Sequence, residues 1–103
     1  MNDLNVLESK VIEWSKARGI IQNSTAMSQT LKAVSEMGEL ADNVNKGRDC
    51  RDDIGDIIVC LINISAIKGY SLSECLSVSY DDIKDRRGHM NENGVFIKEG
   101  DTK

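Results

Sequence analysis

The chain has 103 residues and a formal net charge of −4, which allows one domain with a modest hydrophobic core. The acidic balance disfavours general nucleic-acid binding, because that affinity depends on clustered Lys and Arg. Only 4% of the residues are aromatic and none is proline. Since apolar and charged residues also alternate at helical spacing, the sequence predicts a single all-α domain over residues 1–103.

The cysteines and the length of the apolar runs indicate the cellular compartment of the protein. Cys50, Cys60 and Cys75 are odd in number and widely spaced, which disfavours a disulfide framework or a CxxC zinc site. The longest apolar run is shorter than a membrane span and is interrupted by Asn63, and no signal peptide is visible. We therefore expect a soluble cytoplasmic protein that does not bind membranes.

The first predicted helix runs from about Asn5 to Arg18. Asn5 followed by Glu8 resembles a capping box, and Gly19 is a natural stop. Trp14 lies on the apolar stripe of this helix, so core packing is its default role. A connection then leads to residue 23.

Ser24 or Thr25 can cap a second helix that reaches Lys46 and ends at Gly47. Its helical wheel separates an apolar stripe from a polar face. The stripe contains Val34, Met37, Ala41 and Val44, and the polar face contains Lys32, Glu36, Glu39, Asn43 and Lys46. In a monomer the polar face would point to solvent, so a site there requires a cleft or a partner subunit.

The third predicted helix is capped by Asp49, runs to Lys68 and stops at Gly69. Its residues 54–64 are apolar in nearly every direction around the axis, which predicts the most buried helix of the protein. A chain this short surrounds such a helix poorly. We therefore expect a bundle of four main helices that assembles as a homo-dimer or homo-tetramer.

The fourth helix begins with a capping box formed by Ser71 and Glu74. We expect it to end near Arg87, with Gly88 as its stop. The remaining segment, about 89–103, is rich in Asn, Gly and charge and predicts an irregular or short extended tail.

Two acidic pairs suggest a cation site. Glu36 and Glu39 share one face of the second helix, and Asp53 and Asp56 open the third. If the connection 47–50 folds the two helices back antiparallel, the four carboxylates can converge on a hard divalent cation.

Each pair also has a simpler explanation. Glu36 and Glu39 are ordinary solvated residues of a helix surface, and Asp52 and Asp53 favour the positive end of a helix. Asp56 is harder to explain in this way, because it lies one turn deeper and precedes an apolar run.

The spacing Glu36-x-x-Glu39 and then Asp53-x-x-Asp56 in an all-helical frame resembles the ExxE and ExxD motifs of the MazG-like all-α nucleoside triphosphate pyrophosphohydrolases. The stretches 36–41 and 53–58 are similar to the two signature stretches of that family. The likeness extends from Trp14 to residues 87–90. Asp53 stands where the family usually has glutamate, so we expect either closer helices or a water-mediated contact with a metal.

The resemblance implies a hydrolase that converts a (d)NTP to the monophosphate and pyrophosphate. Mg²⁺, or Mn²⁺ in its place, would be held by the four acids, and Glu36 or Glu39 would accept the proton of the attacking water. The resemblance leaves the choice between these two glutamates open.

The resemblance also suggests residues that contact the substrate. Lys84 and Arg87 would hold phosphate oxygens, although cations near a helix end can simply balance its negative pole. Asn63 would bind the sugar or base, or be satisfied by a neighbouring helix. Trp14 would stack on the base if it is not in the core. Alternative functions are a non-catalytic helical dimerisation or regulatory module and a nucleotide-binding sensor.

Overall fold

Capping and stop residues divide the chain into helices close to those predicted. The computed structural model describes residues 3–100, and these contain five helices and one two-stranded sheet. In chain order the elements are α1 (Leu4–Ala17), α2 (Ile20–Asn23), α3 (Ala26–Asn45), α4 (Arg51–Lys68), α5 (Leu72–Ile83), β1 (Gly88–Met90) and β2 (Phe96–Lys98). The prediction of a mostly helical protein is confirmed.

Four helix termini lie close to where the sequence predicts them, although Cys50, and not Asp49, is the N-cap residue of α4. The Thr25 hydroxyl accepts a hydrogen bond from the Ser28 amide at 3.0 Å, and Asp49 accepts from the Arg51 amide at 3.0 Å. Ser71 and Glu74 form the capping box at the start of α5. Gly69 ends α4 with φ of 84°, a left-handed conformation that costs glycine little.

The start of α1 differs from the prediction. Asp3, rather than Asn5, caps this helix, because its carboxylate accepts hydrogen bonds from the Asn5 and Val6 amides at 2.8 and 3.2 Å. Glu8 is therefore not used in a capping box with Asn5. It is buried and faces another helix instead.

The end of the fourth predicted helix was also wrong, since α5 stops at Ile83 and does not reach Arg87. Gly88 belongs to β1, where a Cβ atom would collide with the Ile97 carbonyl oxygen and the Phe96 ring. The missing side chain of Gly88 thus leaves room for β2, which pairs antiparallel with β1. The predicted tail contains this β-hairpin, and residues 101–103 lie outside the described residues.

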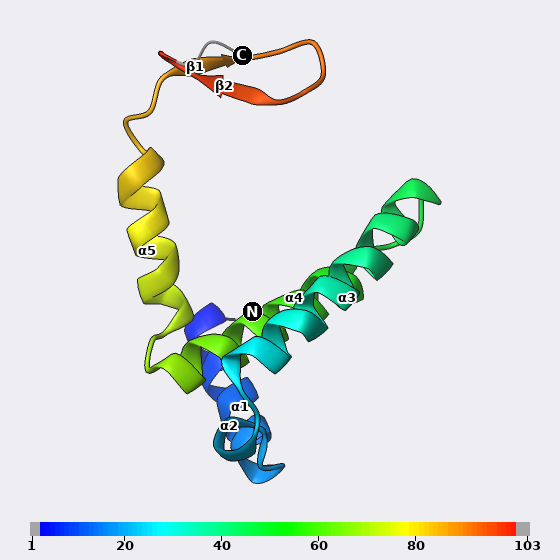
Figure 1. Ribbon diagram of the computed structural model, residues 1–103, viewed down its shortest axis with the longest axis vertical. Coiled ribbons are helices and arrows are strands. Elements are labelled where there is room, and N and C mark those ends of the chain that lie inside the picture. The colour runs from blue at the N-terminus through cyan, green and yellow to red at the C-terminus, as the bar shows by residue number, and fades with distance from the viewer. Residues whose placement is uncertain (1–2, 101–103) are drawn as a thin grey trace.

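The helices pack around α4. α3 lies antiparallel beside it, and α1 and α2 contact it as well (Figure 1). As predicted, α4 has the most buried residues of any helix described, namely Cys60, Ile62, Asn63 and Ser65. Within residues 3–100, no single helix is long and apolar enough to cross a membrane, and only α4 and α5 together, bent by 99°, have that length and composition.

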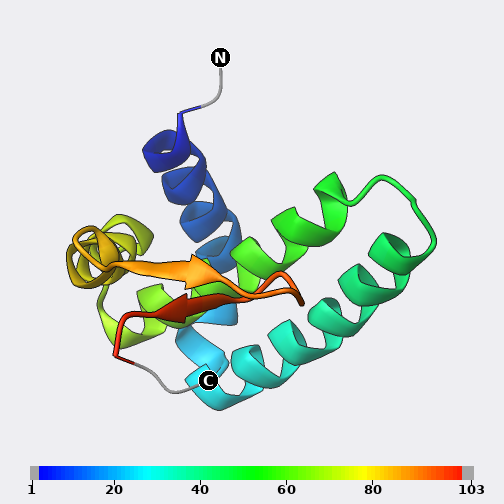
Figure 2. The same cartoon turned by 90° about the horizontal axis from the view of Figure 1, so that it is seen from above.

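α5 and the β-hairpin, here called the arm, stand apart from the other helices. Figure 1 shows α5 rising from the end of α4 with the hairpin at its far end, and Figure 2 shows from above that the hairpin turns back over the helices. No residue of α5 is buried. The described chain therefore does not close into a four-helix bundle by itself, and the bundle stays a prediction for an assembly.

One buried carboxylate joins α1 to the arm. Glu8 is 7% exposed, and its Oε2 accepts a hydrogen bond of 2.6 Å from the Leu72 amide at the first turn of α5. A carboxylate at this position satisfies an otherwise unpaired amide and favours the positive end of the helix. Glu8 thus fixes where α5 begins.

We predict that Glu8→Ala lowers the free energy of unfolding by about 1–3 kcal/mol, because the Leu72 amide loses its acceptor. Urea denaturation measures this loss. Glu13→Ala, at an exposed position of the same helix, is the matched control and should change stability by less than about 0.5 kcal/mol. Equal effects of the two variants would contradict a capping role for Glu8.

Candidate acidic site between α3 and α4

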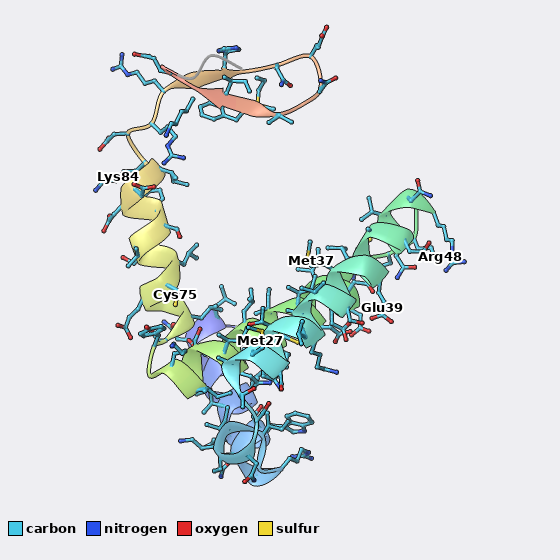
Figure 3. All side chains as sticks on the ribbon, viewed as in Figure 1. Met27, Met37, Glu39, Arg48, Cys75 and Lys84 are labelled. Carbon is cyan, nitrogen blue, oxygen red and sulfur yellow. The ribbon has the colours of Figure 1, made fainter. Side chains whose placement is uncertain are left out.

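α3 packs against α4 through its polar face. The Glu36 side chain is only 15% exposed, whereas Val34 and Met37 on the apolar stripe are 63% and 52% exposed. Met37 and Glu39 project from opposite sides of α3 (Figure 3). The two predicted faces are present, and the part of the polar face that carries Glu36 turns toward α4 in a single chain, while Glu39 stays exposed. For Glu36, the requirement for a cleft is met within one chain.

A cavity of about 450 Å³ lies where this face meets α1, α2 and α4. Glu36 from α3 and Asp56 from α4 both line it, which brings one acid of each motif to the same space. The full lining is Trp14, Ile20, Gln29, Lys32, Glu36, Asp56, Val59, Cys60 and Asn63. Its volume lies within the range of small-molecule sites in proteins.

The carboxylates in this region repel one another. The pKa of Glu36 is raised above its ordinary value of 4.5, chiefly by a hydrogen bond with the Glu39 side chain. Loss of solvent and the negative charges of Glu39 and Asp56 raise it further, while the Lys32 ammonium, 3.9 Å away, acts in the opposite direction. One lysine only partly compensates this charge, so the site can accept another cation.

Asp53 is held differently from the other acids. The Asn43 side-chain amide donates to both of its carboxylate oxygens, at 3.1 and 3.0 Å. Among residues 3–100, no three acidic, histidine or cysteine side chains lie close enough to hold a metal ion together. The four predicted ligands thus lie on one pair of helices but not at one point. Glu36 lies beside Glu39 and across from Asp56. Asp53 is bound to Asn43.

Trp14 lies at the cavity and not in the core. It is 47% exposed, lines the cavity, and its ring is covered by the Arg18 guanidinium at 4.3 Å from the ring centroid. The default expectation of core packing was wrong for this residue. One face of the indole is used by a cation–π contact.

Asn63 is buried, lines the cavity and is hydrogen-bonded to two neighbouring helices. Its Oδ1 accepts from the Ser15 hydroxyl at 2.6 Å, and its amide donates to Gln29 Oε1 at 3.1 Å. This is the simpler of the two predicted roles. The network nevertheless fixes which way Gln29, another lining residue, presents its amide.

Sequence reasoning missed Gln29, Lys32 and Cys60 as cavity residues. For Gln29, the sequence does contain a signal: residues 29, 33, 36, 40 and 43 repeat at the spacing of side chains that face a neighbouring helix. The pKa of the Cys60 thiol is raised by burial, so this sulfur stays protonated and is a poor nucleophile.

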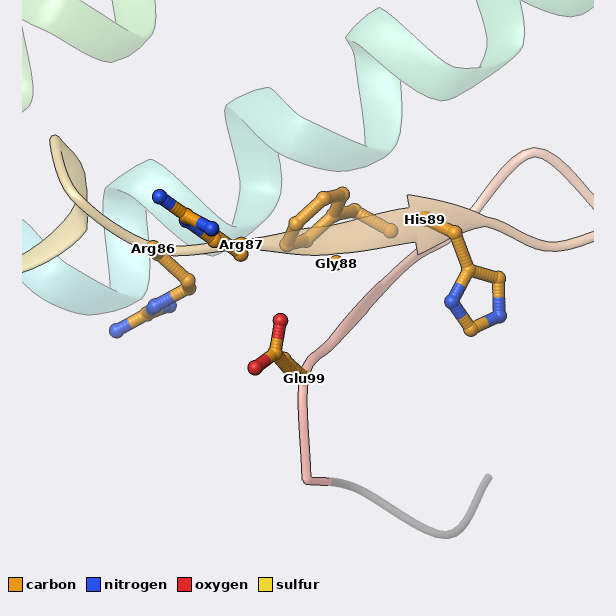
Figure 4. Close-up of a pocket in the computed structure, with 6 residues that line it drawn as sticks. Arg86, Arg87, Gly88, His89 and Glu99 are labelled. Atoms are coloured by element: carbon orange, nitrogen blue, oxygen red, sulfur yellow. The ribbon is translucent and has the colours of Figure 1, made fainter.

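Lys84 and Arg87 are not brought to the acids of their own chain. Lys84 forms an ion pair with Asp81 at 3.4 Å and lies near the top of α5 (Figure 3). Arg87 lines a separate open cavity of about 550 Å³ on the arm, together with Arg86, Gly88, His89, Phe96 and Glu99 (Figure 4). Neither residue lines the cavity that contains Glu36 and Asp56.

Comparison with known proteins adds one relative. The chain is 33% identical over 64 residues to an uncharacterized 18.2 kDa protein in the rep-hol intergenic region of Haemophilus phage HP1 (strain HP1c1). The match covers 60% of this chain but only 39% of the phage protein, so the chain spans about two-fifths of that relative. No family model matches the chain, and no solved structure matches it significantly. The MazG-like resemblance therefore rests on the acidic motifs and their setting.

We predict that Glu36→Gln raises the melting temperature at neutral pH by a few degrees and that this gain disappears near pH 4. Because the folded-state pKa of Glu36 is raised, its contribution to stability is fully present below the unfolded value of 4.5 and is lost as pH rises through the folded pKa. Thermal unfolding from pH 4 to pH 8 without divalent cations tests this.

Asp42→Asn is the matched control, since Asp42 is an exposed acid of the same helix that pairs with Lys46 at 2.8 Å. This variant should show no gain at neutral pH. A pH-independent difference between wild type and Glu36→Gln would contradict carboxylate repulsion at Glu36.

Proposed function

We propose that the protein is a Mg²⁺-dependent nucleoside triphosphate pyrophosphohydrolase that releases a nucleoside monophosphate and pyrophosphate. The observation that supports this most is the packing of α3 on α4 through the acid-bearing face, with Glu36 and Asp56 lining one cavity. A carboxylate pair with uncompensated charge, facing a cavity of ligand size, is typical of a functional site. The protein would act in the cytoplasm, where its three free cysteines stay reduced.

The donor set fits a hard divalent cation. Glu36, Glu39, Asp53 and Asp56 offer only oxygen ligands, and Glu36 lies close enough to Glu39 and Asp56 for their negative charges to raise its pKa, after the larger effects of the Glu39 hydrogen bond and of burial. Bound Mg²⁺ or Mn²⁺ would neutralise part of the triphosphate charge and lower the pKa of the attacking water. Asn43 would keep the Asp53 carboxylate oriented toward the site.

The other lining residues suit the rest of a nucleotide. Lys32 is a cation at the rim of the cavity and can pair with a phosphate oxygen in place of Glu36. Gln29 offers an amide whose orientation is fixed by Asn63, and Trp14 offers an indole ring. Glu36 or Glu39 would accept the proton of the attacking water, whichever is less committed to the metal.

A second candidate is a non-catalytic helical dimerisation module or nucleotide sensor. It is favoured by the spread of the acids, since no three of them converge in the described residues. In that case the cavity would bind a nucleotide or structural metal without turnover. Release of pyrophosphate from a panel of canonical and modified nucleoside triphosphates with Mg²⁺ separates an enzyme from both alternatives.

We predict that Glu39→Gln and Asp56→Asn each lower pyrophosphohydrolase activity by about two orders of magnitude or more, as expected for loss of a metal ligand. The melting temperature of the metal-free protein should stay level or rise, because one repelling charge is removed. The stabilisation by Mg²⁺ should shrink, since less of the cation is bound.

The matched control is again Asp42→Asn, an acid of α3 that points to solvent. It should keep both its activity and its Mg²⁺-induced shift in melting temperature. Retention of full Mg²⁺ binding by Asp56→Asn would argue that the acids are only helix-end charges.

We also predict that Lys84→Ala raises KM for the nucleotide by about tenfold with little change in stability, because a cation that faces phosphate contributes binding energy and little packing. Arg87→Ala should have a smaller effect. Steady-state kinetics below saturation measure both. A KM for Lys84→Ala equal to that of the wild type would leave Lys84 with only its pairing to Asp81.

A further inference from the structure

A second cavity, of about 420 Å³, adjoins the one that contains Glu36 and is called here the side cavity. It lies between α1 and α4, and it shares three lining residues with the first cavity, namely Trp14, Asp56 and Val59. A molecule bound at Glu36 can therefore extend past Asp56 into the side cavity. The volume of the side cavity lies within the range of small-molecule sites.

One face of α1 supplies most of the wall of the side cavity. Its residues repeat at the i, i+3, i+4 and i+7 spacing of a helical face, and they are Leu7, Lys10, Val11 and Trp14. Val59 and Asp56 contribute the wall from α4. The wall is thus apolar except at Lys10 and Asp56, which suits a flat ring better than a phosphate chain.

Lys10 is the distinctive polar residue of this wall. Within residues 3–100 it forms no ion pair, whereas Lys32 in the first cavity lies 3.9 Å from Glu36. A lysine side chain offers three hydrogen-bond donors and no acceptor. In the proposed site Asp56 is committed to the cation, so Lys10 is the polar group left for a ring in the side cavity.

We infer that the side cavity binds the base of the nucleotide and that Lys10 selects bases with a carbonyl oxygen at the edge farthest from the sugar. Uracil and thymine carry such an acceptor at O4, and guanine carries one at O6. Cytosine and adenine have an amino group there, which is a donor that lysine cannot pair with. The substrate class is therefore nucleoside triphosphates with keto bases, an inference that rests on the proposed function.

The position of Lys10 determines which edge of the base it meets. Lys10 and Leu7 line only the side cavity, whereas Trp14 and Asp56 also line the cavity of Glu36. With the phosphates at Glu36 and the ring beside Trp14, the sugar lies near the shared wall. The opposite edge of the base then faces Lys10, and it carries the substituent at position 4 of a pyrimidine or position 6 of a purine.

Trp14 provides a direct readout of this binding. It is the only tryptophan of the sequence, and it lines the side cavity, so its fluorescence reports a ring bound there. Arg18 covers one face of the indole, which leaves the other face for stacking. Stacking does not depend on the identity of the base, so discrimination between bases is left to Lys10.

Fluorescence titration of the full chain with dUMP and dCMP in the presence of Mg²⁺ measures binding without hydrolysis. These two nucleotides differ in the carbonyl or amino group at position 4 and in the matching protonation of N3. The wild type should bind dUMP about tenfold more tightly than dCMP, because only dUMP offers an acceptor to Lys10.

Lys10→Met keeps an apolar stem and removes the donors. It should weaken dUMP binding to the level of dCMP and change dCMP binding by less than about twofold. Lys10→Arg retains donors and should keep the preference for dUMP. Lys16→Met is the matched control, because Lys16 is an exposed lysine of α1 that lines neither cavity. Circular dichroism should show native helix content in all three variants, since both lysines are exposed.

An equal loss of both nucleotides in Lys10→Met would assign Lys10 to the phosphate and overturn the inference. A wild type without a preference for dUMP, or without a fluorescence response to millimolar dUMP, would also overturn it. A wild type that prefers dUMP through Lys10 but hydrolyses no nucleoside triphosphate would reject the proposed function and leave the selection of the base standing.

Discussion

The structure depends on a polar seam between two antiparallel helices. α3 meets α4 through Gln29, Ala33, Glu36 and their neighbours, and not through its apolar stripe. A partly shielded interface that holds Glu36 close to Glu39 and Asp56 is costly unless a cation or hydrogen bonds compensate it. Lys32 and Asn43 supply part of that compensation. The remaining charge is the physical reason to expect a ligand there.

The inward polar face has a direct consequence for the rest of the molecule. Since α3 turns Gln29, Ala33 and Glu36 toward the rest of the chain, its apolar stripe faces away from it. The buried apolar residues of the described chain, Ala33, Cys60 and Ile62, make a small core for a chain of this size. Much of the apolar surface of α3 and α5 is left exposed in the part of the chain that the structure describes.

Signals that act within one helical turn predicted most helix ends, although the expected Asn5–Glu8 box of α1 did not form. Thr25, Gly69 and the Ser71–Glu74 box act within a turn of their own position, so their roles can be read from neighbouring residues. The end of α5 could not be predicted, because the residues after Ile83 are compatible with a helix. Gly88 is required by the approach of β2, a contact made eight to ten residues away along the chain.

The candidate site was predicted in part for the same reason. Pairs three residues apart on a helix face are visible in the sequence, and the structure places Glu36 beside Glu39 and across from Asp56. The rule that apolar faces turn inward gave the wrong orientation for α3, since it assumes that a single chain buries its own apolar surface. Trp14 was assigned to the core by the same rule, although it lies at the cavity.

The central claim is that the acid-bearing faces of α3 and α4 form one cation site. Paramagnetic Mn²⁺ titrated into the ¹⁵N-labelled wild-type protein tests it most directly, because the ion broadens the amide signals nearest to it first. The account predicts that amides of residues 36–40 and 53–57 broaden together at the lowest Mn²⁺ concentrations. First broadening at another acidic group, such as Asp81 and Asp82 on α5, or uniform broadening along the chain, would contradict it.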